Sequence, residues 1–222
     1  MRIYKKIIKF SLIFVLISLP TSFANSKTAP SSFADLAEKL MPSVVNIAST
    51  QTIKTTSNPF KNFQFPPGSP FEDMFKEFNR PTERKATALG SGFIIDKKGI
   101  VVTNNHVIQG AEDIIVSVNG ATEYKAKVIG TDPYMDLAVL QIESDEKFKP
   151  VSFGDSDKAR IGDWVIAIGN PYGFGGSVTS GIISSRNRDI GLTRYDDFIQ
   201  TDASINQGNS GGPLFDFSKF LL

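Results

Sequence analysis

Short runs of apolar residues, most of them alternating with polar ones, follow one another from residue 44 onward. Alternation with a period of two places one face of a strand in a core and the other in water. Turn signals separate the runs, the strongest being Asn119-Gly120, which favours a tight hairpin. The pattern predicts a small antiparallel barrel of six strands, at residues 44–47, 91–95, 100–103, 114–118, 124–129 and 137–142.

A second set of strands follows a charged stretch at residues 143–149, which is typical of a linker between domains. These strands are predicted at residues 164–168, 177–184, 198–201 and 213–215. A glycine-rich run at residues 169–176 lies between the first two. It matches neither a phosphate-binding loop nor a dinucleotide-binding fingerprint, so we interpret it as a turn.

One short helix is predicted before the first strand. Phe33, Leu36, Ala37 and Leu40 recur at helical spacing, and Pro42 ends the run. The preceding Ser32-Phe33-Ala34-Asp35 resembles a capping box with Asp in place of Glu. We expect this amphipathic helix to cover the core.

Residues 51–89 interrupt the strand pattern with five prolines and six phenylalanines. Prolines favour a loop, but this many phenylalanines are unusual in a solvated linker, because each exposed ring forgoes roughly 1.5–3 kcal/mol of burial. The loop is expected either to pack on its own domain or to contact another subunit or cover an active site. We favour the second interpretation.

The N-terminus has the features of a signal peptide. Its first nine residues carry four basic side chains, residues 10–19 are apolar, and Ser22-Phe23-Ala24 places small residues at a cleavage site. Cleavage after Ala24 predicts an exported chain without a stable membrane span, since the apolar stretch is shorter than a bilayer requires. The chain has no cysteine, so disulfides cannot stabilise it.

Charge narrows the possible partners. The formal net charge is +1, and removal of the four basic residues of the leader lowers it to about −3. A nearly balanced mature chain gives no sign of nucleic-acid binding. The sequence also shows no cofactor motif and no metal-ligand spacing.

Three residues indicate a chemistry. Ser210 lies among glycines in Gly208-Asn209-Ser210-Gly211-Gly212, His106 is the single histidine, and Asp136 directly precedes a strand. A serine nucleophile needs a base, and a histidine base needs a carboxylate to orient it, for which we expect a buried aspartate. The backbone N–H groups of Gly208 and Ser210 are the natural donors for an oxyanion.

Each of these features has an ordinary structural explanation when taken alone. A lone histidine is often structural, an aspartate can end a strand, and a glycine-rich loop can be a plain turn. Gly208-x-Ser210-x-Gly212 also fits the nucleophile elbow of α/β-hydrolases, but that fold places its histidine after the serine. The order His106, Asp136, Ser210 is that of the chymotrypsin type.

With these motifs in place, the chain resembles the HtrA/DegP family of trypsin-like serine proteases over roughly residues 33–216. The resemblance is carried by residues 90–95, 103–107, 132–140, 169–171 and 200–213. It implies an all-β fold with two six-stranded barrels and a catalytic site between them, formed by His106, Asp136 and Ser210 with an oxyanion hole at Gly208 and Ser210. It also implies unfolded or misfolded protein substrates, a role in periplasmic quality control and stress response, and a homotrimer or a multiple of one.

The sequence departs from the family pattern after Leu214, where the expected strands of the second barrel and any PDZ domain do not follow. We therefore expect a signal peptide at 1–24, a first barrel at 25–145 that includes the helix and the loop at 51–89, and an incomplete second barrel at 150–222. The primary hypothesis is a serine endopeptidase. The alternative is a catalytically impaired, truncated protease that acts at most as a peptide-binding or chaperone-like protein.

Overall fold

The computed structural model describes residues 30–55, 82–169, 176–191, 193, 195–218 and 220–222. The chain forms two compact units, residues 1–31 and 32–222. All described helices and strands belong to the second unit. The predicted signal peptide and the phenylalanines of the 51–89 segment lie outside the described residues.

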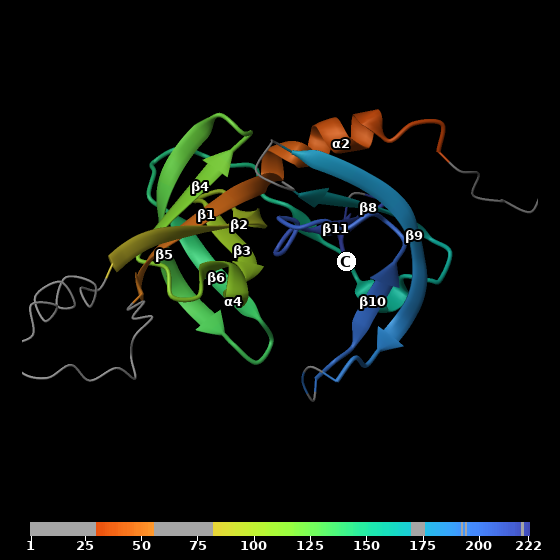
Figure 1. Ribbon diagram of the computed structural model, residues 1–222. Helices are drawn as coiled ribbons and strands as arrows, with labels where there is room; N and C mark the ends of the chain where they lie inside the picture. Colours follow the sequence, from red (N-terminus) through yellow and green to blue (C-terminus); the bar gives the residue numbers. More distant parts are fainter. Residues whose placement is uncertain (1–29, 56–81, 170–175, 192, 194, 219) are drawn as a thin grey trace, which may run out of the picture. The chain divides into compact units, whose positions relative to one another are not determined.

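The first six strands form a closed antiparallel barrel, shown with the strand labels in Figure 1. Around the barrel the order is β1-β2-β3-β6-β5-β4, and β1 pairs with both β2 and β4. This confirms the predicted fold class. The strands are β1 (Val44–Thr55), β2 (Thr82–Asp96), β3 (Ile100–Asn104), β4 (Asp113–Val118), β5 (Thr122–Asp132) and β6 (Leu137–Ile142).

The barrel core follows the alternation read in the sequence. Every second residue of β4 and of β6 is buried, so that Val116 and Leu140 are fully inside. The predicted hairpin between β4 and β5 turns at Asn119 and Gly120, which have φ angles of 54° and 66°. Positive φ at both positions is what a type I′ turn requires.

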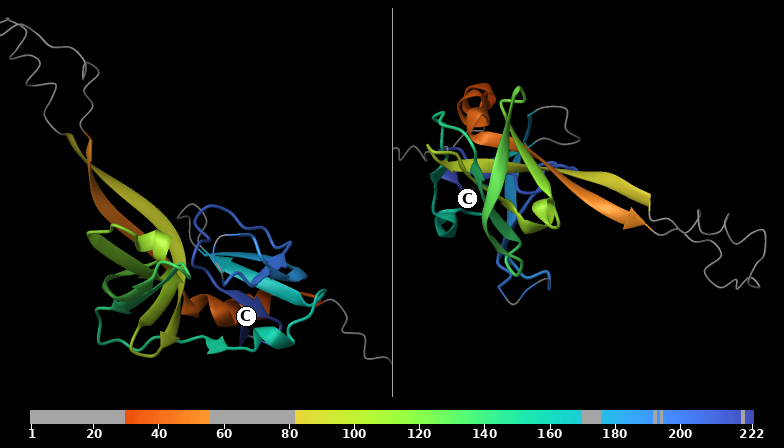
Figure 2. Two further views of the ribbon diagram at one scale, coloured as in Figure 1. Left: turned by 90° about the horizontal axis from the view of Figure 1, so that it is seen from below. Right: turned by 90° about the vertical axis from the view of Figure 1, so that its left-hand side faces the viewer.

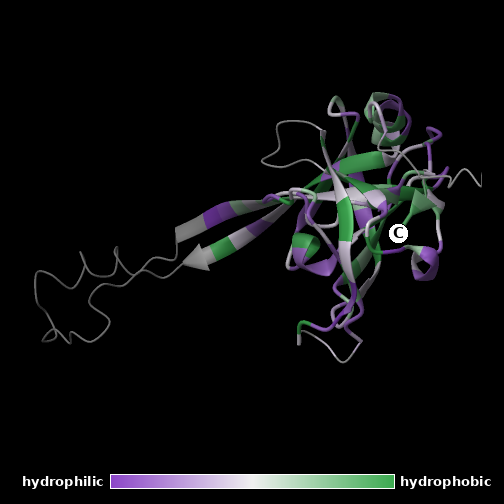
Figure 3. Ribbon diagram, turned by 90° about the vertical axis from the view of Figure 1, so that its right-hand side faces the viewer, coloured by the Kyte–Doolittle hydropathy of each residue, from purple (hydrophilic) through white to green (hydrophobic). Residues whose placement is uncertain are grey.

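Strands β1 and β2 extend beyond the predicted boundaries. They stay paired to Thr55 and Thr82, although residues 51–55 and 82–89 were expected to belong to the loop. Both views of Figure 2 show this two-stranded extension, and Figure 3 shows both hydrophilic and hydrophobic residues along it. The prolines all lie between residues 59 and 81, so the flanking residues are free to pair.

The second sheet has six strands in the order β10-β9-β8-β11-β12-β7. Within the described part of the chain this sheet does not close into a barrel, as expected for an incomplete second barrel. Two short strands, β7 and β12, were not predicted, and they pair in parallel. The bounds are β7 (Ser152–Phe153), β8 (Trp164–Gly169), β9 (Ser177–Arg188), β10 (Phe198–Thr201), β11 (Leu214–Asp216) and β12 (Phe220–Leu221), with a 3-10 helix η2 (Ser156–Lys158) after β7.

The predicted helix is α2 (Ala34–Leu40), followed by the 3-10 helix η1 (Met41–Ser43) with Pro42 in its first turn. Leu36 and Leu40 pack in the core of the second sheet, together with Phe215 and Leu221. The sequence grouped this helix with the first barrel, whereas its buried side chains pack in the core of the second sheet. Figure 1 shows the helix ribbon beside β8 and β9. Its role as a cover on a core is confirmed.

The start of α2 differs from a capping box. The N-cap residue is Phe33, and no side chain caps the helix there. Ser32 lies one residue too early, and its Oγ accepts from the N–H of Ala34 at 3.1 Å. Phe33 instead contacts the Trp164 ring, with centroids 5.8 Å apart, and the Phe217 ring at 5.4 Å. Ring packing therefore places the helix start.

The segment between the two sheets is packed. Phe148 is buried in the first core, and its N–H donates to the Lys97 carbonyl. Three residues later, Val151 is buried in the second core while its N–H donates to the Ile94 carbonyl of β2. Strand β2 itself faces both ways, with Ile94 in the first core and Phe93 against the second. The two cores thus share elements.

Candidate active site

His106 lies on a one-turn helix, α4 (Asn105–Ile108), that follows β3. Val107 and Ile108 are buried and anchor this turn to the first barrel, which leaves the imidazole exposed. The His106 ring Nδ1 lies 2.6 Å from Asp136 Oδ2. The His106 backbone N–H also donates to Asp136 Oδ1 at 2.8 Å. Both carboxylate oxygens therefore hold the same residue.

Asp136 is positioned by its backbone as well as its side chain. It adopts a left-handed conformation with φ 52°, which is uncommon outside glycine. Its carbonyl accepts from the Asn105 N–H at 3.0 Å and from Asn104 Nδ2 at 2.9 Å. These bonds tie the turn before β6 to the end of β3. Two loops distant in sequence are thereby joined where the His106–Asp136 pair forms.

Two supporting residues were missed as site residues from sequence. Asn104 bonds the Asp136 carbonyl, and Asp132 Oδ1 accepts from the N–H groups of Tyr134 and Met135. Asn and Asp bond to nearby backbone in this way at many turns. The sequence shows that these residues are Asn and Asp, but it does not show which backbone groups they bond.

The carboxylate of Asp136 was expected to be buried, and this expectation is wrong. The Asp136 side chain is 43% exposed and that of His106 is 53% exposed. The reason is that Asp136 ends a surface turn whose neighbours Tyr134 and Met135 are also exposed. Water reaches the pair, so direct hydrogen bonding rather than a low-dielectric interior holds the imidazole.

Ser210 lies in a glycine turn before β11. Gly208 and Gly211 have φ angles of 101° and 81°, which side chains rarely adopt. The Asn209 N–H donates to the Asn206 carbonyl at 3.0 Å, and the Gly212 N–H donates to the Asn209 carbonyl at 2.8 Å. The loop is therefore held by its own backbone on both sides of Ser210.

The Ser210 loop touches the first barrel directly. Ser91 N–H donates to the Ser210 carbonyl, and Ser91 Oγ donates to the Gly208 carbonyl, each at 2.8 Å. A Cβ on Gly211 would lie 2.2 Å from Thr103 Oγ1 and 2.9 Å from the Asn104 backbone nitrogen. Only glycine permits this approach. The loop thus rests on the end of β3, beside the turn that carries His106.

The structure brings Ser210 to the His106 turn but does not bond the two side chains. Gly90 lies between the His106 turn and the Ser210 loop. A Cβ on Gly90 would be 2.6 Å from Val107 Cγ1 and 3.2 Å from the Ser210 carbonyl oxygen. Within the described ranges, no hydrogen bond joins Ser210 Oγ to the His106 ring. Catalytic hydrogen bonds are often long in unliganded enzymes and tighten when substrate binds.

The two expected oxyanion donors are unoccupied. Among the residues described, none accepts a hydrogen bond from the backbone N–H of Gly208 or of Ser210. The neighbouring N–H groups of Asn209 and Gly212 are both used inside the loop. Two free donors two residues apart are what binding of an oxyanion requires.

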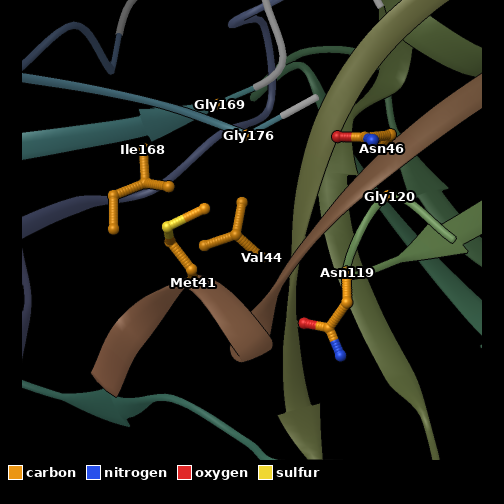
Figure 4. Close-up of a pocket in the computed structure, with 8 residues that line it drawn as sticks. All are labelled: Met41, Val44, Asn46, Asn119, Gly120, Ile168, Gly169 and Gly176. Carbon is orange, nitrogen blue, oxygen red and sulfur yellow. The ribbon is translucent and has the colours of Figure 1, made fainter. Parts of the chain in front are cut away.

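A pocket of about 330 Å³ lies elsewhere, and it includes none of His106, Asp136 and Ser210. In Figure 4 the apolar side chains of Met41, Val44 and Ile168 lie together, apart from Asn46 and Asn119. Its remaining lining residues are Gly120, Gly169 and Gly176. Gly169 lies against the Ser210 loop, because a Cβ there would be 2.4 Å from Asn209 Oδ1.

The described residues contain neither a metal-binding cluster nor a membrane-spanning helix. No group of three or more His, Cys, Asp or Glu side chains gathers there in a way that could hold a metal ion. No helix in those ranges has the length and apolar character to cross a membrane.

Comparison with known proteins gives a consistent family. Residues 90–222 match the model of the trypsin-like peptidase domain. The chain is 46% identical over 217 residues to a probable periplasmic serine endoprotease DegP-like from Brucella suis biovar 1, covering 86% of this chain and 42% of that protein. A relative of the same name from Rickettsia conorii is 47% identical over 209 residues, covering 89% of this chain and 41% of that protein. The chain thus spans less than half the length of these curated relatives.

Solved structures agree with the sequence relatives. A substituted form of the HtrA-type protease AlgW with a decapeptide superposes with a TM-score of 0.74 and 40% identity, covering 86% of this chain and 56% of that one. AlgW with a tripeptide gives 0.68 and 38%, covering 86% and 52%. The closed barrel, the second sheet and these matches together show that the chain belongs to the trypsin-like peptidase family and is similar to its HtrA-type, DegP-like serine endoproteases.

Proposed function

We propose that this chain is a serine endopeptidase in which Ser210 is the nucleophile, His106 the general base and Asp136 the carboxylate that orients it. The observation that carries the proposal is the double hydrogen bond between Asp136 and His106, at 2.6 and 2.8 Å. The first bond fixes Nδ1 as the protonated nitrogen, so that Nε2 is left to accept a proton. The second stops the backbone of His106 from moving away.

Peptide cleavage would then proceed in two stages. Ser210 Oγ attacks the substrate carbonyl while its proton passes to His106 Nε2, and the N–H groups of Gly208 and Ser210 bind the oxyanion that forms. The C–N bond breaks as His106 returns the proton to the leaving amine, which leaves an acyl-enzyme. Water, deprotonated by His106, then hydrolyses the ester and restores Ser210. Asp136 stays ionised throughout and stabilises the imidazolium.

The substrates we propose are unfolded or misfolded proteins in the periplasm. This part of the proposal is supported by the relatives named periplasmic serine endoproteases and by the solved relatives that carry peptides. The predicted signal peptide with cleavage after Ala24 agrees with export. A homotrimer or a multiple of one is the assembly that the family resemblance implies, and quality control under stress is the corresponding role.

The proposal is tested with a fluorophosphonate probe, which forms a covalent bond with an activated serine. We expect the chain without residues 1–24 to be labelled, and Ser210→Ala to lose labelling completely. Asp136→Asn should slow labelling by about 10⁴-fold, because its amide would present an N–H group to His106 Nδ1 and favour the wrong tautomer. Ser204→Ala, an exposed serine on the segment before the loop, is the matched control and should label normally.

The outcomes separate the two hypotheses made from the sequence. Labelling of Ser204→Ala and wild type but not of Ser210→Ala supports the endopeptidase. A wild-type chain that is folded by circular dichroism yet takes no label would contradict it. The peptide-binding alternative would then be favoured, and suppression of aggregation of an unfolded client, equal with and without Ser210, would measure it.

A further inference from the structure

We infer that Ser91 is a positioning residue that holds the Ser210 loop in the conformation needed for its two oxyanion donors; the inference rests on the proposed function. Ser91 lies on β2, in the first barrel, and is completely buried. Ser91 belongs to the motif at residues 90–95 that carries the family resemblance, but it was not predicted as a site residue. Its contacts give it a specific task.

Ser91 makes two hydrogen bonds to the Ser210 loop. Its backbone N–H donates to the Ser210 carbonyl and its Oγ to the Gly208 carbonyl, both at 2.8 Å. Ser91 is itself held, because Thr103 Oγ1 donates to the Ser91 carbonyl at 2.7 Å. Thr103 is also buried and lies on β3, the strand that leads into the His106 turn. A chain of hydrogen bonds therefore connects that strand with the nucleophile loop.

Ser91 holds the peptide units 208–209 and 210–211, which lie on either side of the unit that carries the Ser210 N–H. The Gly208 and Ser210 carbonyls bond to Ser91, and the Asn209 carbonyl bonds to the Gly212 N–H. A peptide unit is rigid and planar, so fixing the Asn209 carbonyl sets the direction of the Ser210 N–H. The Gly208 N–H belongs to the peptide unit before the one that Ser91 holds, and the two units meet at Gly208, whose φ is 101°.

The packing around Ser91 leaves little freedom for another arrangement. A Cβ on Gly90 would lie 2.6 Å from Val107 Cγ1, and a Cβ on Gly92 would lie 2.9 Å from Val101 Cγ1. The backbone of β2 thus approaches its neighbours closely on both sides of Ser91. Loss of the hydroxyl would leave the buried Gly208 carbonyl without this donor, which destabilises that peptide orientation.

Ser91→Ala is the main test, with Ser49→Ala as its matched control. Ser49 is also buried in the first barrel, and its Oγ donates to the Val107 carbonyl at 2.6 Å, so both variants lose one buried hydroxyl–carbonyl bond. Ser91→Cys keeps the volume with a weaker donor and serves if the alanine variant folds poorly. The readouts are hydrogen exchange of the peptide spanning residues 205–213 and the steady-state kinetics of peptide cleavage.

We expect Ser91→Ala to speed exchange in that peptide and to lower kcat about 10- to 100-fold with little change in KM, since weakened oxyanion binding affects the transition state. Ser91→Cys should lie in between, and Ser49→Ala should leave exchange in the peptide 205–213 unchanged. Unchanged exchange in Ser91→Ala, or unchanged kcat in an active enzyme, would overturn the inference. If the wild type cleaves and labels nothing, the proposed function fails, and the exchange measurement alone decides whether Ser91 holds the loop.

Discussion

Gly169 lies against the Ser210 loop, beside Ser91, whose Oγ would be 3.1 Å from a Cβ on Gly169. Its place is tight, because a Cβ would lie 2.4 Å from Asn209 Oδ1, an oxygen that is buried and has no hydrogen-bond partner among the described residues. A Cβ at this position therefore presses on the side chain of Asn209, the residue before the nucleophile. A single methyl group at this position is enough to shift the residue next to the nucleophile.

We expect Gly169→Ala to reduce fluorophosphonate labelling of Ser210 at least tenfold. Gly130→Ala is the matched control, since a Cβ on that strand glycine would meet no atom within 4 Å. Its labelling rate should equal that of wild type. Equal rates for both alanine variants would show that the loop adapts to the extra methyl group.

At the scale of single residues, the sequence identified candidate catalytic residues better than it identified the hydrogen-bond partners that position them. His106, Asp136, Ser210 and Gly208 were chosen from their chemistry and order, and the structure places the first two in direct contact. The roles of Ser91 and Asn104 depend on hydrogen bonds to residues far along the chain, which no local pattern indicates. The exposure of Asp136 was missed for the same reason, because burial depends on what surrounds a turn.

Helix α2 depends on a partner far away in the sequence. Leu36 and Leu40 are its buried residues, and both pack in the core of the second sheet. A helix of seven residues is too short to be stable in water by itself. Its stability must come from this packing, and the second sheet gains a cover in return.

Leu40→Ala should lower the free energy of unfolding by about 2–5 kcal/mol, the usual cost of this truncation in a core. Glu38→Ala, on the exposed face of the same helix, keeps helix propensity and should stay within about 0.5 kcal/mol of wild type. Urea titration followed by circular dichroism measures both. A Leu40→Ala variant as stable as Glu38→Ala would mean that the helix contributes little to the second core.

The sequence predicted the strands whose positions follow from a local pattern. It missed the strand ends and short strands that exist only because they pair with a distant segment. Alternation located the six barrel strands, and Asn119-Gly120 located their clearest hairpin. The ends of β1 and β2 were assigned to a loop because the prolines nearby outweighed a polar strand pattern. Strands β7 and β12 have two residues each, which is too short for any periodicity. Only their pairing defines them, parallel with each other and antiparallel between β12 and β11.

Over residues 32–222 the two sheets are joined by shared elements. Phe148 fills the first core while Val151 fills the second, and β2 has side chains in both. We therefore expect the two sheets to unfold in one cooperative transition. The single tryptophan, Trp164, lies in the second sheet and reports on that sheet alone.

Phe148→Ala provides the test, because Phe148 belongs to the first core only. It should lower the urea midpoint seen by Trp164 fluorescence, with a loss of about 3–5 kcal/mol for a buried phenylalanine. Phe153→Ala, whose ring is 61% exposed, is the control and should move the midpoint little. A Trp164 transition that ignores Phe148→Ala would show that the sheets unfold independently.

The position of α2 has a consequence for how such genes can recombine. The helix precedes the first barrel in the chain, yet its buried face belongs to the second sheet. A crossover near residue 146 between two diverged relatives would give one parent's helix to the other parent's sheet. Functional chimaeras should therefore be more frequent when residues 32–43 are exchanged together with the second sheet, because a junction near residue 146 does not divide the gene into two independently exchangeable halves.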